Sequence, residues 1–204
     1  MKGIHERMNK IKPVLLAFLM TMCSLTYPLT NASAEDSLSL EWRQIQTDYA
    51  QAAVIHKLYQ AFQHHDGEAM ASVYHPDATF EDPAFGTLKG KEIGAMWKFL
   101  LELSQRQIAI RYSQVDVHNG IGTAHWDADY RFSLTGFYID NHIDSRFSFK
   151  DGLIYSQQDH FDFHRWSALA IGLPGQLLGG TPFLKAYFQS QVRQRLADWM
   201  KTHP

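Results

Sequence analysis

The spacing of apolar residues changes part-way along the chain, from a helical period to a period of two. Apolar residues recur every three or four positions over Ser37–His65, which predicts a long helix. A short helix over Glu68–Tyr74, a short strand over Ala78–Glu81 and a third helix from Gly90 are expected next. The alternating pattern that follows predicts four long strands, over residues 107–117, 121–133, 137–150 and 153–163.

Two of these predicted strands have one apolar face and one charged face. The apolar face comprises Ala124, Trp126, Ala128, Tyr130 and Phe132 on one strand, and Ile139, Asn141, Ile143, Ser145 and Phe147 on the next. Helices followed by antiparallel strands indicate the α+β class, with the helices packed on the apolar side of the sheet. Polar residues on that side are the candidates for chemistry, namely Tyr130, Asn141, Ser145, Gln157 and Asp159.

The apolar pattern of the last part of the chain predicts a helical extension. Thr181 and Pro182 suit the cap and first turn of a helix that runs to Met200, with an apolar stripe that includes Phe183 and Trp199. This tail could cover the mouth of a pocket, pair with a second subunit or touch a membrane surface. Core or dimer packing is the commonest role of such a stripe.

The N-terminus has the layout of a secretory signal peptide. Positive residues precede an apolar run over Val14–Met22, and Ala32–Ala34 is a small-residue cleavage signature. We therefore expect cleavage after Ala34 and export to a periplasm or to the outside. The apolar run is shorter than the ~20 residues of a spanning helix, so no membrane span is expected after cleavage.

Cleavage changes the charge and the cysteine count. The full chain has 19 basic and 21 acidic residues; removing the four basic residues and one acid of residues 1–34 leaves 15 and 20, a net charge of −5. This acidic balance and the lack of a basic patch argue against a nucleic-acid partner. The only cysteine, Cys23, is also removed, so no intrachain disulfide is expected.

The most informative segment is Pro76–Pro83, which reads Pro-Asp-Ala-Thr-Phe-Glu-Asp-Pro. An aspartate before proline at the rim of an apolar pocket can have a raised pKa and act as a general base. Asp82 is that candidate. The alternative is that Asp82 only caps a turn before Pro83.

Several short segments together carry a family resemblance, and their order and spacing matter more than any one of them. They are residues 59–62, 76–83, 86–90, 145–149, 151–154 and 159–162. On these segments, over about residues 53–166, the chain resembles the nuclear transport factor 2-like superfamily, in its SnoaL-like and ketosteroid-isomerase-like branch. The resemblance implies a cone-shaped, curved antiparallel sheet with the N-terminal helices on its concave face. It also implies a homodimer. Together with the signal peptide (1–34), the expected domains are a SnoaL-like domain (35–166) and a C-terminal helical extension (167–204).

The resemblance assigns the general base of ketosteroid-isomerase-like proteins to Asp82. Their two oxyanion donors fall on Leu58 and Ser145, with Tyr59 next to Leu58 but turned about 100° around the helix. Each missing donor costs ~10² or more in rate, so steroid isomerisation itself is not expected. A pocket for a small, largely apolar carbonyl compound is expected instead, without a cofactor, lined by Tyr59, Phe80, Trp97, Trp126, Tyr130, Asn141, Ser145 and Asp159.

One alternative stays open at this point, a non-catalytic binding or partner-binding module on the same fold. A metal site at His160, Asp162 and His164 is a further idea. These residues would share one strand face but span ~13 Å, too far for one ion without bending. No metal is therefore expected there. The charged residues His125, Asp127, His142, Asp144 and Arg146 are interpreted as cross-strand pairs.

Overall fold

The computed structural model describes residues 31–203. Most of the predicted signal peptide lies outside the described residues, and export stays a prediction. The chain divides into two compact units, residues 1–42 and residues 43–204, and the second contains the sheet and the cavity described below. The elements in chain order are α3 (Asn31–Gln63), α4 (Gly67–Ala71), β1 (Tyr74–Asp82), β2 (Gly86–Lys89), α5 (Lys91–Leu103), β3 (Ala109–His118), β4 (Ile121–Arg131), β5 (Tyr138–Lys150), β6 (Leu153–His160), α6 (Phe163–Ile171), α7 (Leu173–Leu178) and α8 (Pro182–Thr202).

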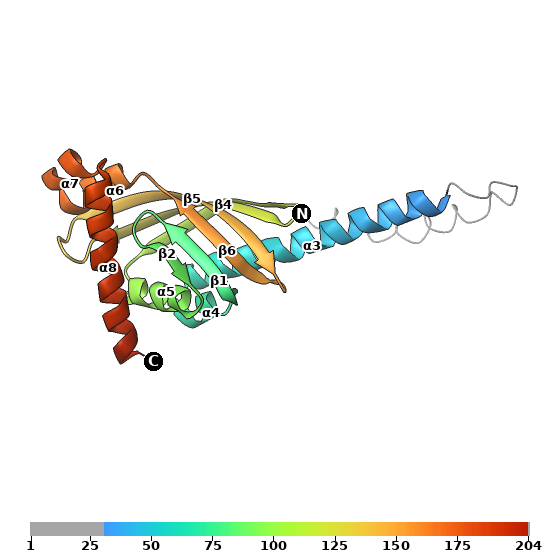
Figure 1. Cartoon of the computed structure of the whole chain (residues 1–204), viewed down its shortest axis with the longest axis horizontal. Helices are drawn as coiled ribbons and strands as arrows, with labels where there is room; N and C mark the ends of the chain where they lie inside the picture. Colours follow the sequence, from blue (N-terminus) through green and yellow to red (C-terminus); the bar gives the residue numbers. More distant parts are fainter. Residues whose placement is uncertain (1–30, 204) are drawn as a thin grey trace, which may run out of the picture. The chain divides into compact units, whose positions relative to one another are not determined.

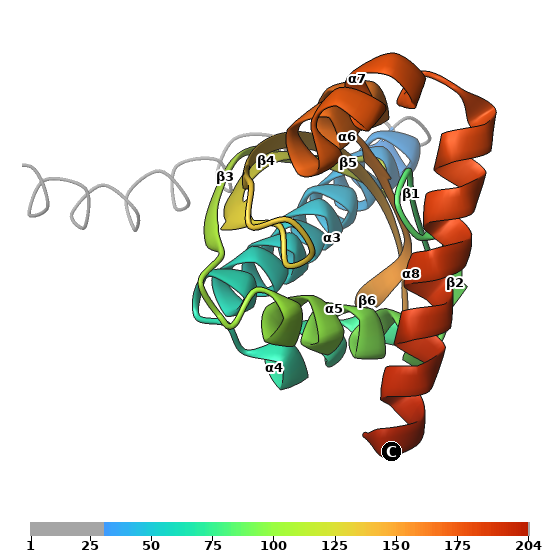
Figure 2. The same ribbon diagram turned by 90° about the vertical axis from the view of Figure 1, so that its left-hand side faces the viewer.

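The six strands form one curved sheet in the order β2-β1-β6-β5-β4-β3. All neighbouring strands are antiparallel except β1 and β6, which run parallel. Figure 1 shows the sheet with its helices, and Figure 2 shows the second unit's part of α3 within the curve of the sheet. The predicted α+β class and the curved, mostly antiparallel sheet are thus confirmed, with one parallel pair that the sequence pattern did not predict.

The concave face of the sheet carries the core. Residues alternate between buried and more exposed along β4 and β5, as the pattern predicted. On this face Trp126 pairs with Ile143, and Ala128 pairs with Asn141. Phe62 of α3 packs against the Trp126 ring at 5.7 Å between ring centroids. The apolar sheet face therefore buries itself against the N-terminal helices.

Several boundaries differ from the predicted ones, most by one or two residues and some by more. The helix expected to reach Tyr74 ends at Ala71, and Tyr74 instead begins β1, which is longer than the short strand predicted there. Strand β2 was missed. Strand β6 ends at His160 because the Asp162 carboxylate accepts a hydrogen bond from the Arg165 backbone N–H at 3.0 Å and caps α6.

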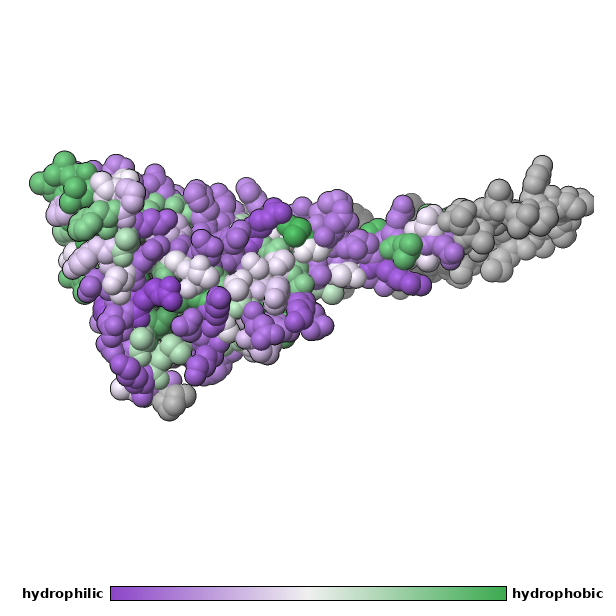
Figure 3. Space-filling model, in the orientation of Figure 1, coloured by the Kyte–Doolittle hydropathy of each residue, from purple (hydrophilic) through white to green (hydrophobic). Residues whose placement is uncertain are grey.

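The C-terminal extension packs on the sheet-bearing part of the same unit. Trp166 of α6 and Leu196 of α8 are buried in the core, and the Trp166 and Phe188 rings meet edge to face at 4.7 Å. Leu173 and Leu177 of α7 remain exposed. Figure 3 shows a hydrophobic area at the upper left, where Figure 1 draws α7. Within residues 31–203, no helix combines the length and the apolar character needed to cross a membrane.

Gly90, which precedes α5, occupies a backbone conformation that only glycine adopts easily. Its φ is +53°, and a Cβ atom there would lie 2.8 Å from the Pro76 carbonyl oxygen. Gly90→Ala is therefore expected to lower the free energy of unfolding by about 2 kcal/mol, measured by urea denaturation. Gly120→Ala is the matched control, because Gly120 has a φ of +76° but no atom within 4 Å of the added Cβ. Equal losses in both variants would show that the contact with Pro76 contributes nothing.

Candidate functional site

The second unit contains a cavity of about 170 Å³ whose wall is mostly aromatic and aliphatic. Residues from α3, β1, α5 and the strands β4, β5 and β6 form most of it, and helices α6 and α8 add to it. Apolar residues of the wall include Phe62, Phe80, Phe85, Met96, Trp97, Ile108, Trp126, Ile143, Phe161 and Trp166.

Most of the side chains expected at a ligand pocket lie in this wall. The cavity brings together Phe80, Asp82, Trp97, Trp126, Tyr130, Asn141 and Asp159. Two expected residues, Tyr59 and Ser145, are not part of the wall. Both are buried, and their hydroxyl groups hydrogen-bond to each other at 2.9 Å. They support the cavity wall instead of facing a ligand.

Asp82, at the end of β1, both caps its own turn and lines the cavity. Its Oδ1 accepts a hydrogen bond from the Phe85 backbone N–H at 2.5 Å. Burial, helped by the nearby Asp159 charge, raises the pKa of Asp82 to about 7 against the opposing effect of the Phe85 and Ala84 N–H groups. Both protonation states are therefore accessible near neutral pH. The turn-capping role and the general-base role are compatible here.

Asp159, on β6, is the second carboxylic acid of the cavity. Its Oδ1 accepts hydrogen bonds from the Ser145 hydroxyl at 2.6 Å and from the Gln157 amide at 2.9 Å. Burial raises the pKa of Asp159 to about 7, although these two donors oppose the rise. Because both donors engage Oδ1, a proton on this carboxyl group belongs on Oδ2.

A buried hydrogen-bond network positions Asp159 through the Ser145 hydroxyl. Ser145 is paired with Asp159 across β5 and β6. Its Oγ accepts from the Tyr59 hydroxyl at 2.9 Å and from the Trp126 indole N–H at 3.0 Å. With both lone pairs occupied, the Ser145 hydrogen points to Asp159.

A second arm of the network reaches Asp159 through Gln157. The Trp97 indole N–H donates to the Tyr74 hydroxyl at 3.0 Å, and that hydroxyl donates to Gln157 Oε1 at 2.5 Å. Each donor in both arms is directed toward Asp159, so the bonds polarise one another. Tyr74 was missed because the sequence pattern placed it at the end of a helix. The strong alternation of apolar residues from Tyr74 to Phe80 was the available signal.

Two polar groups of the wall have unused hydrogen-bonding capacity. The Tyr130 hydroxyl accepts from the Trp166 indole N–H at 2.9 Å, and its own hydrogen has no acceptor among residues 31–203. Burial raises the pKa of Tyr130 to about 12, and the Asp82 charge adds to the rise, so Tyr130 stays a donor at neutral pH. Asn141 is only 7% exposed, and its side-chain amide has no hydrogen-bond partner in the part of the chain that the structure describes.

A sequence comparison identifies the family. A model of the SnoaL-like domain matches residues 55–157, about half of the chain. The protein belongs to the SnoaL-like domain family. No curated protein sequence matches the chain.

Solved structures of the same fold agree with this assignment. The SnoaL-like protein has a TM-score of 0.55 with Bal32a from a soil-derived mobile gene cassette, at 18% identity over 61% of this chain and 98% of that chain. TerC, co-crystallised with polyporic acid, gives 0.52 at 17% identity over 59% and 98%. A putative SnoaL-like polyketide cyclase from Jannaschia sp. CCS1 gives 0.53 at 12% identity over 62% and 94%.

The structure places the two residues to which the ketosteroid-isomerase resemblance assigned oxyanion donors, Leu58 and Ser145, outside the cavity wall. Leu58 is apolar and fully buried. The Ser145 hydroxyl donates to Asp159 and not into the cavity. The polar groups that remain in the cavity wall are on neighbouring positions, above all Tyr130 and Asn141.

The C-terminal helices of this SnoaL-like protein contribute residues that the sequence analysis did not assign to the pocket. Phe188, Gln191, Val192 and Arg195 of α8 line the cavity. Covering the pocket mouth was one of three roles considered for the tail. Phe188 and Val192 are four residues apart, so the sequence predicts that they share one face of α8. This spacing does not predict which surface of the protein that face contacts.

The expectation that His160, Asp162 and His164 share one strand face is wrong. His160 ends β6, Asp162 caps α6, and His164 lies within α6, where its Nε2 contacts the Gln176 carbonyl oxygen at 2.8 Å. The three residues therefore do not share a strand face.

Proposed function

We propose that this SnoaL-like protein binds a small, largely apolar carbonyl compound in its cavity and transfers a proton on it. The observation that carries the proposal is the pairing of two carboxylic acids, Asp82 and Asp159, in one apolar cavity, each with a pKa of about 7. Perturbed titratable groups that meet in a cavity are typical of acid–base sites.

The chemistry follows from the protonation states. Ionised Asp82 removes a proton from the carbon next to the carbonyl group. Tyr130 and Asn141 donate hydrogen bonds to the oxygen, where negative charge develops. Asp82 then returns the proton to another carbon of the same compound, which gives an isomerisation. In a ring closure the carbanion instead attacks a second carbonyl carbon of the same compound, that C=O π bond breaks, and Asp82 gives the proton to the resulting oxygen. Protonated Asp159 supplies a third donor through Oδ2.

The relatives support a cavity for small organic molecules. TerC was crystallised with polyporic acid, and the Jannaschia protein is described as a putative polyketide cyclase. We also propose that the protein acts after export, because residues 1–34 have the layout of a signal peptide. A homodimer, as the family resemblance implies, is part of the same proposal.

A specific observation supports a second candidate, binding without turnover. At the two positions to which the resemblance assigns oxyanion donors, Leu58 is apolar and buried, and the Ser145 hydroxyl donates to Asp159. The cavity would then hold its ligand, and Tyr130 and Asn141 would only orient it.

A thermal-shift screen tests for the ligand. The panel contains apolar carbonyl compounds, sterols and fatty acids, each tested with the wild type, Asp82→Asn and the exposed-site control Asp116→Asn. A ligand at a hundred times its Kd adds ~2.7 kcal/mol, which raises the Tm by several degrees at about 2–4 °C per kcal/mol. We expect this rise in Tm for the wild type and for the control, and a rise of a different size for Asp82→Asn.

The screen distinguishes the candidates. A shift that changes only in Asp82→Asn places the ligand beside that carboxyl group and supports proton transfer. A shift of equal size in all three proteins favours binding without this chemistry. No shift across the panel would contradict both candidates and favour a partner-binding module.

A further inference from the structure

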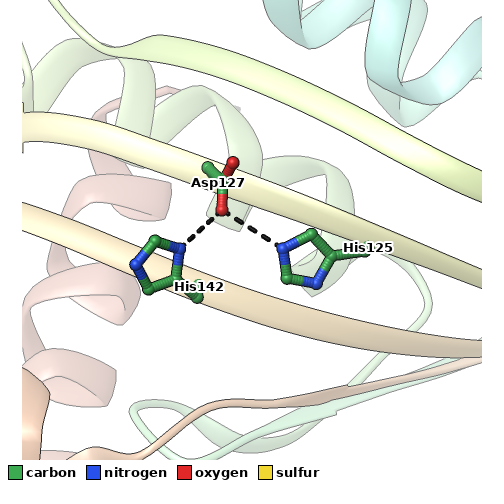
Figure 4. A group of neighbouring side chains, drawn as sticks. All are labelled: His125, Asp127 and His142. Carbon is green, nitrogen blue, oxygen red and sulfur yellow. Dashed lines mark hydrogen bonds and ion pairs between the residues drawn. The ribbon is translucent and has the colours of Figure 1, made fainter.

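A cluster of histidines and aspartates lies on the face of the sheet opposite the cavity side. His125 and Asp127 lie on β4, and His142 lies on β5 directly opposite Asp127. Figure 4 shows both imidazole rings turned toward the Asp127 carboxylate between them. The proposed function does not use these residues.

The three side chains have the spacing of metal ligands. Asp127 Oδ1 lies 3.2 Å from His125 Nε2 and 2.6 Å from His142 Nδ1. One ligand atom from each residue lies within 4.8 Å of the other two. Ligands at 2.0–2.1 Å from a tetrahedral zinc ion lie roughly 3.3 Å apart, so small side-chain adjustments suffice.

Each histidine also has an aspartate on its other ring nitrogen. His125 Nδ1 lies 2.8 Å from Asp144 Oδ1, and His142 Nε2 lies 3.3 Å from Asp140 Oδ1. Metal-binding histidines characteristically donate their second N–H to such a carboxylate, which fixes the ring orientation and makes the ligand nitrogen more basic. An ordinary surface ion pair does not require this arrangement at two histidines at once.

We propose that His125, Asp127 and His142 bind a divalent transition-metal ion of the zinc type on this face of the sheet. Two imidazole nitrogens and one carboxylate oxygen suit Zn²⁺ and its neighbours in the first transition row, whereas Mg²⁺ and Ca²⁺ prefer oxygen ligands alone. Three protein ligands leave a position for water. Asp144 and Asp140 orient the histidines, and Arg111 holds the other Asp127 oxygen at 3.6 Å.

Carboxylates of Asp127, Asp140 and Asp144 surround the two imidazole rings, an arrangement that favours a cation. Further charged groups face the cluster from the neighbouring strands and α6. Arg111 and Asp129 pair across β3 and β4, and Arg165 pairs with Asp140 at 3.1 Å. Bound metal replaces any proton on the ligand nitrogens, so affinity should increase as pH rises.

Metal titration of the untagged full chain tests the proposal. After chelator treatment, the protein is titrated with Co²⁺, followed by visible absorption, and with Zn²⁺, followed by calorimetry. We expect one ion per chain, tighter binding at pH 8 than at pH 6, and no response to Mg²⁺. His142→Asn should weaken Zn²⁺ binding at least 100-fold, and Asp144→Asn should weaken it about 10- to 100-fold.

His75→Asn is the matched control. His75 also lies between two aspartates, at 3.9 Å from Asp77 and 3.5 Å from Asp151, but among residues 31–203 it belongs to no cluster of three potential metal ligands. The His75→Asn variant should therefore bind Zn²⁺ as tightly as the wild type. Circular dichroism establishes that each variant is folded. Zn²⁺ binding that is absent in the wild type, or unchanged in folded His142→Asn, would overturn the proposal.

Discussion

Asp82→Asn is expected to be more stable than the wild type at pH 8.5, by about 2 kcal/mol, although it removes the proposed general base. Keeping an ionised carboxylate in an apolar cavity beside Asp159 costs free energy. The amide has no charge, and its oxygen still accepts the Phe85 N–H hydrogen bond. A stabilising substitution at a functional group is the expected sign of a trade-off between stability and activity.

The pH dependence follows from the direction of the pKa shift. The folded pKa of Asp82 is about 7, above its ordinary value of 3.8, so the folded protein keeps a proton that the unfolded chain loses. Its contribution to stability is complete below pH 4 and is lost as pH rises to about 7. Three pKa units correspond to ~4 kcal/mol, and we expect about half of this because water can screen the second oxygen. The advantage of Asp82→Asn therefore grows between pH 5 and pH 8.5.

Thermal unfolding at pH 5, 7 and 8.5 measures this effect. About 2 kcal/mol corresponds to a Tm rise of about 4–8 °C at pH 8.5. Asp116→Asn, which removes a carboxylate from an exposed position on β3, should leave the Tm unchanged. A lower Tm for Asp82→Asn at pH 8.5 would show that the Asp82 charge is stabilised in the folded protein, contrary to our account.

Ser145→Ala is expected to have the largest effect on stability, a loss of about 3 kcal/mol. The substitution leaves the buried Tyr59 hydroxyl and the buried Trp126 indole N–H without their acceptor. It also removes one of the two donors to Asp159 Oδ1, so the pKa of Asp159 should rise further. Urea denaturation at pH 6 measures the loss of stability.

Ser148→Ala provides the control for this prediction. Ser148 lies on the same strand, is only partly buried, and makes no side-chain hydrogen bond to any of residues 31–203. Its loss should stay within about 0.5 kcal/mol. Similar losses in the two variants would mean that the network around Ser145 does not hold the site together.

The sheet and part of the site could be predicted from the sequence because strand alternation decides which side chains face the core. Alternation along β4 and β5 determines which side chains face the core, so Tyr130 and Asn141 could be assigned to the apolar face. Asp82 came from a local motif. The same alternation placed Ser145 on that face, and helical spacing placed Tyr59 among the apolar residues of α3. Neither pattern could show that the two hydroxyl groups hydrogen-bond to each other.

The remaining residues depend on tertiary packing. The apolar stripe of α8 predicted burial, but the stripe does not specify that Phe188 and Val192 close the cavity. Tyr74 was assigned to a helix because the helix was expected to continue up to the residues before Pro76, which breaks it. The pKa of Asp159 depends on burial and on donors from β5 and β6, which no local pattern reveals.

The most direct test of the account is a carboxyl ¹³C NMR titration of the aspartates from pH 3 to pH 9, in the wild type and in Asp82→Asn. The account predicts two coupled titrations near pH 7, which belong to Asp82 and Asp159 as a pair. Asp82→Asn should leave one of them, at a lower pH, because the neighbouring charge is gone. If every aspartate of the wild type titrates below pH 5, the cavity does not hold a proton at neutral pH and the proposed acid–base site is wrong.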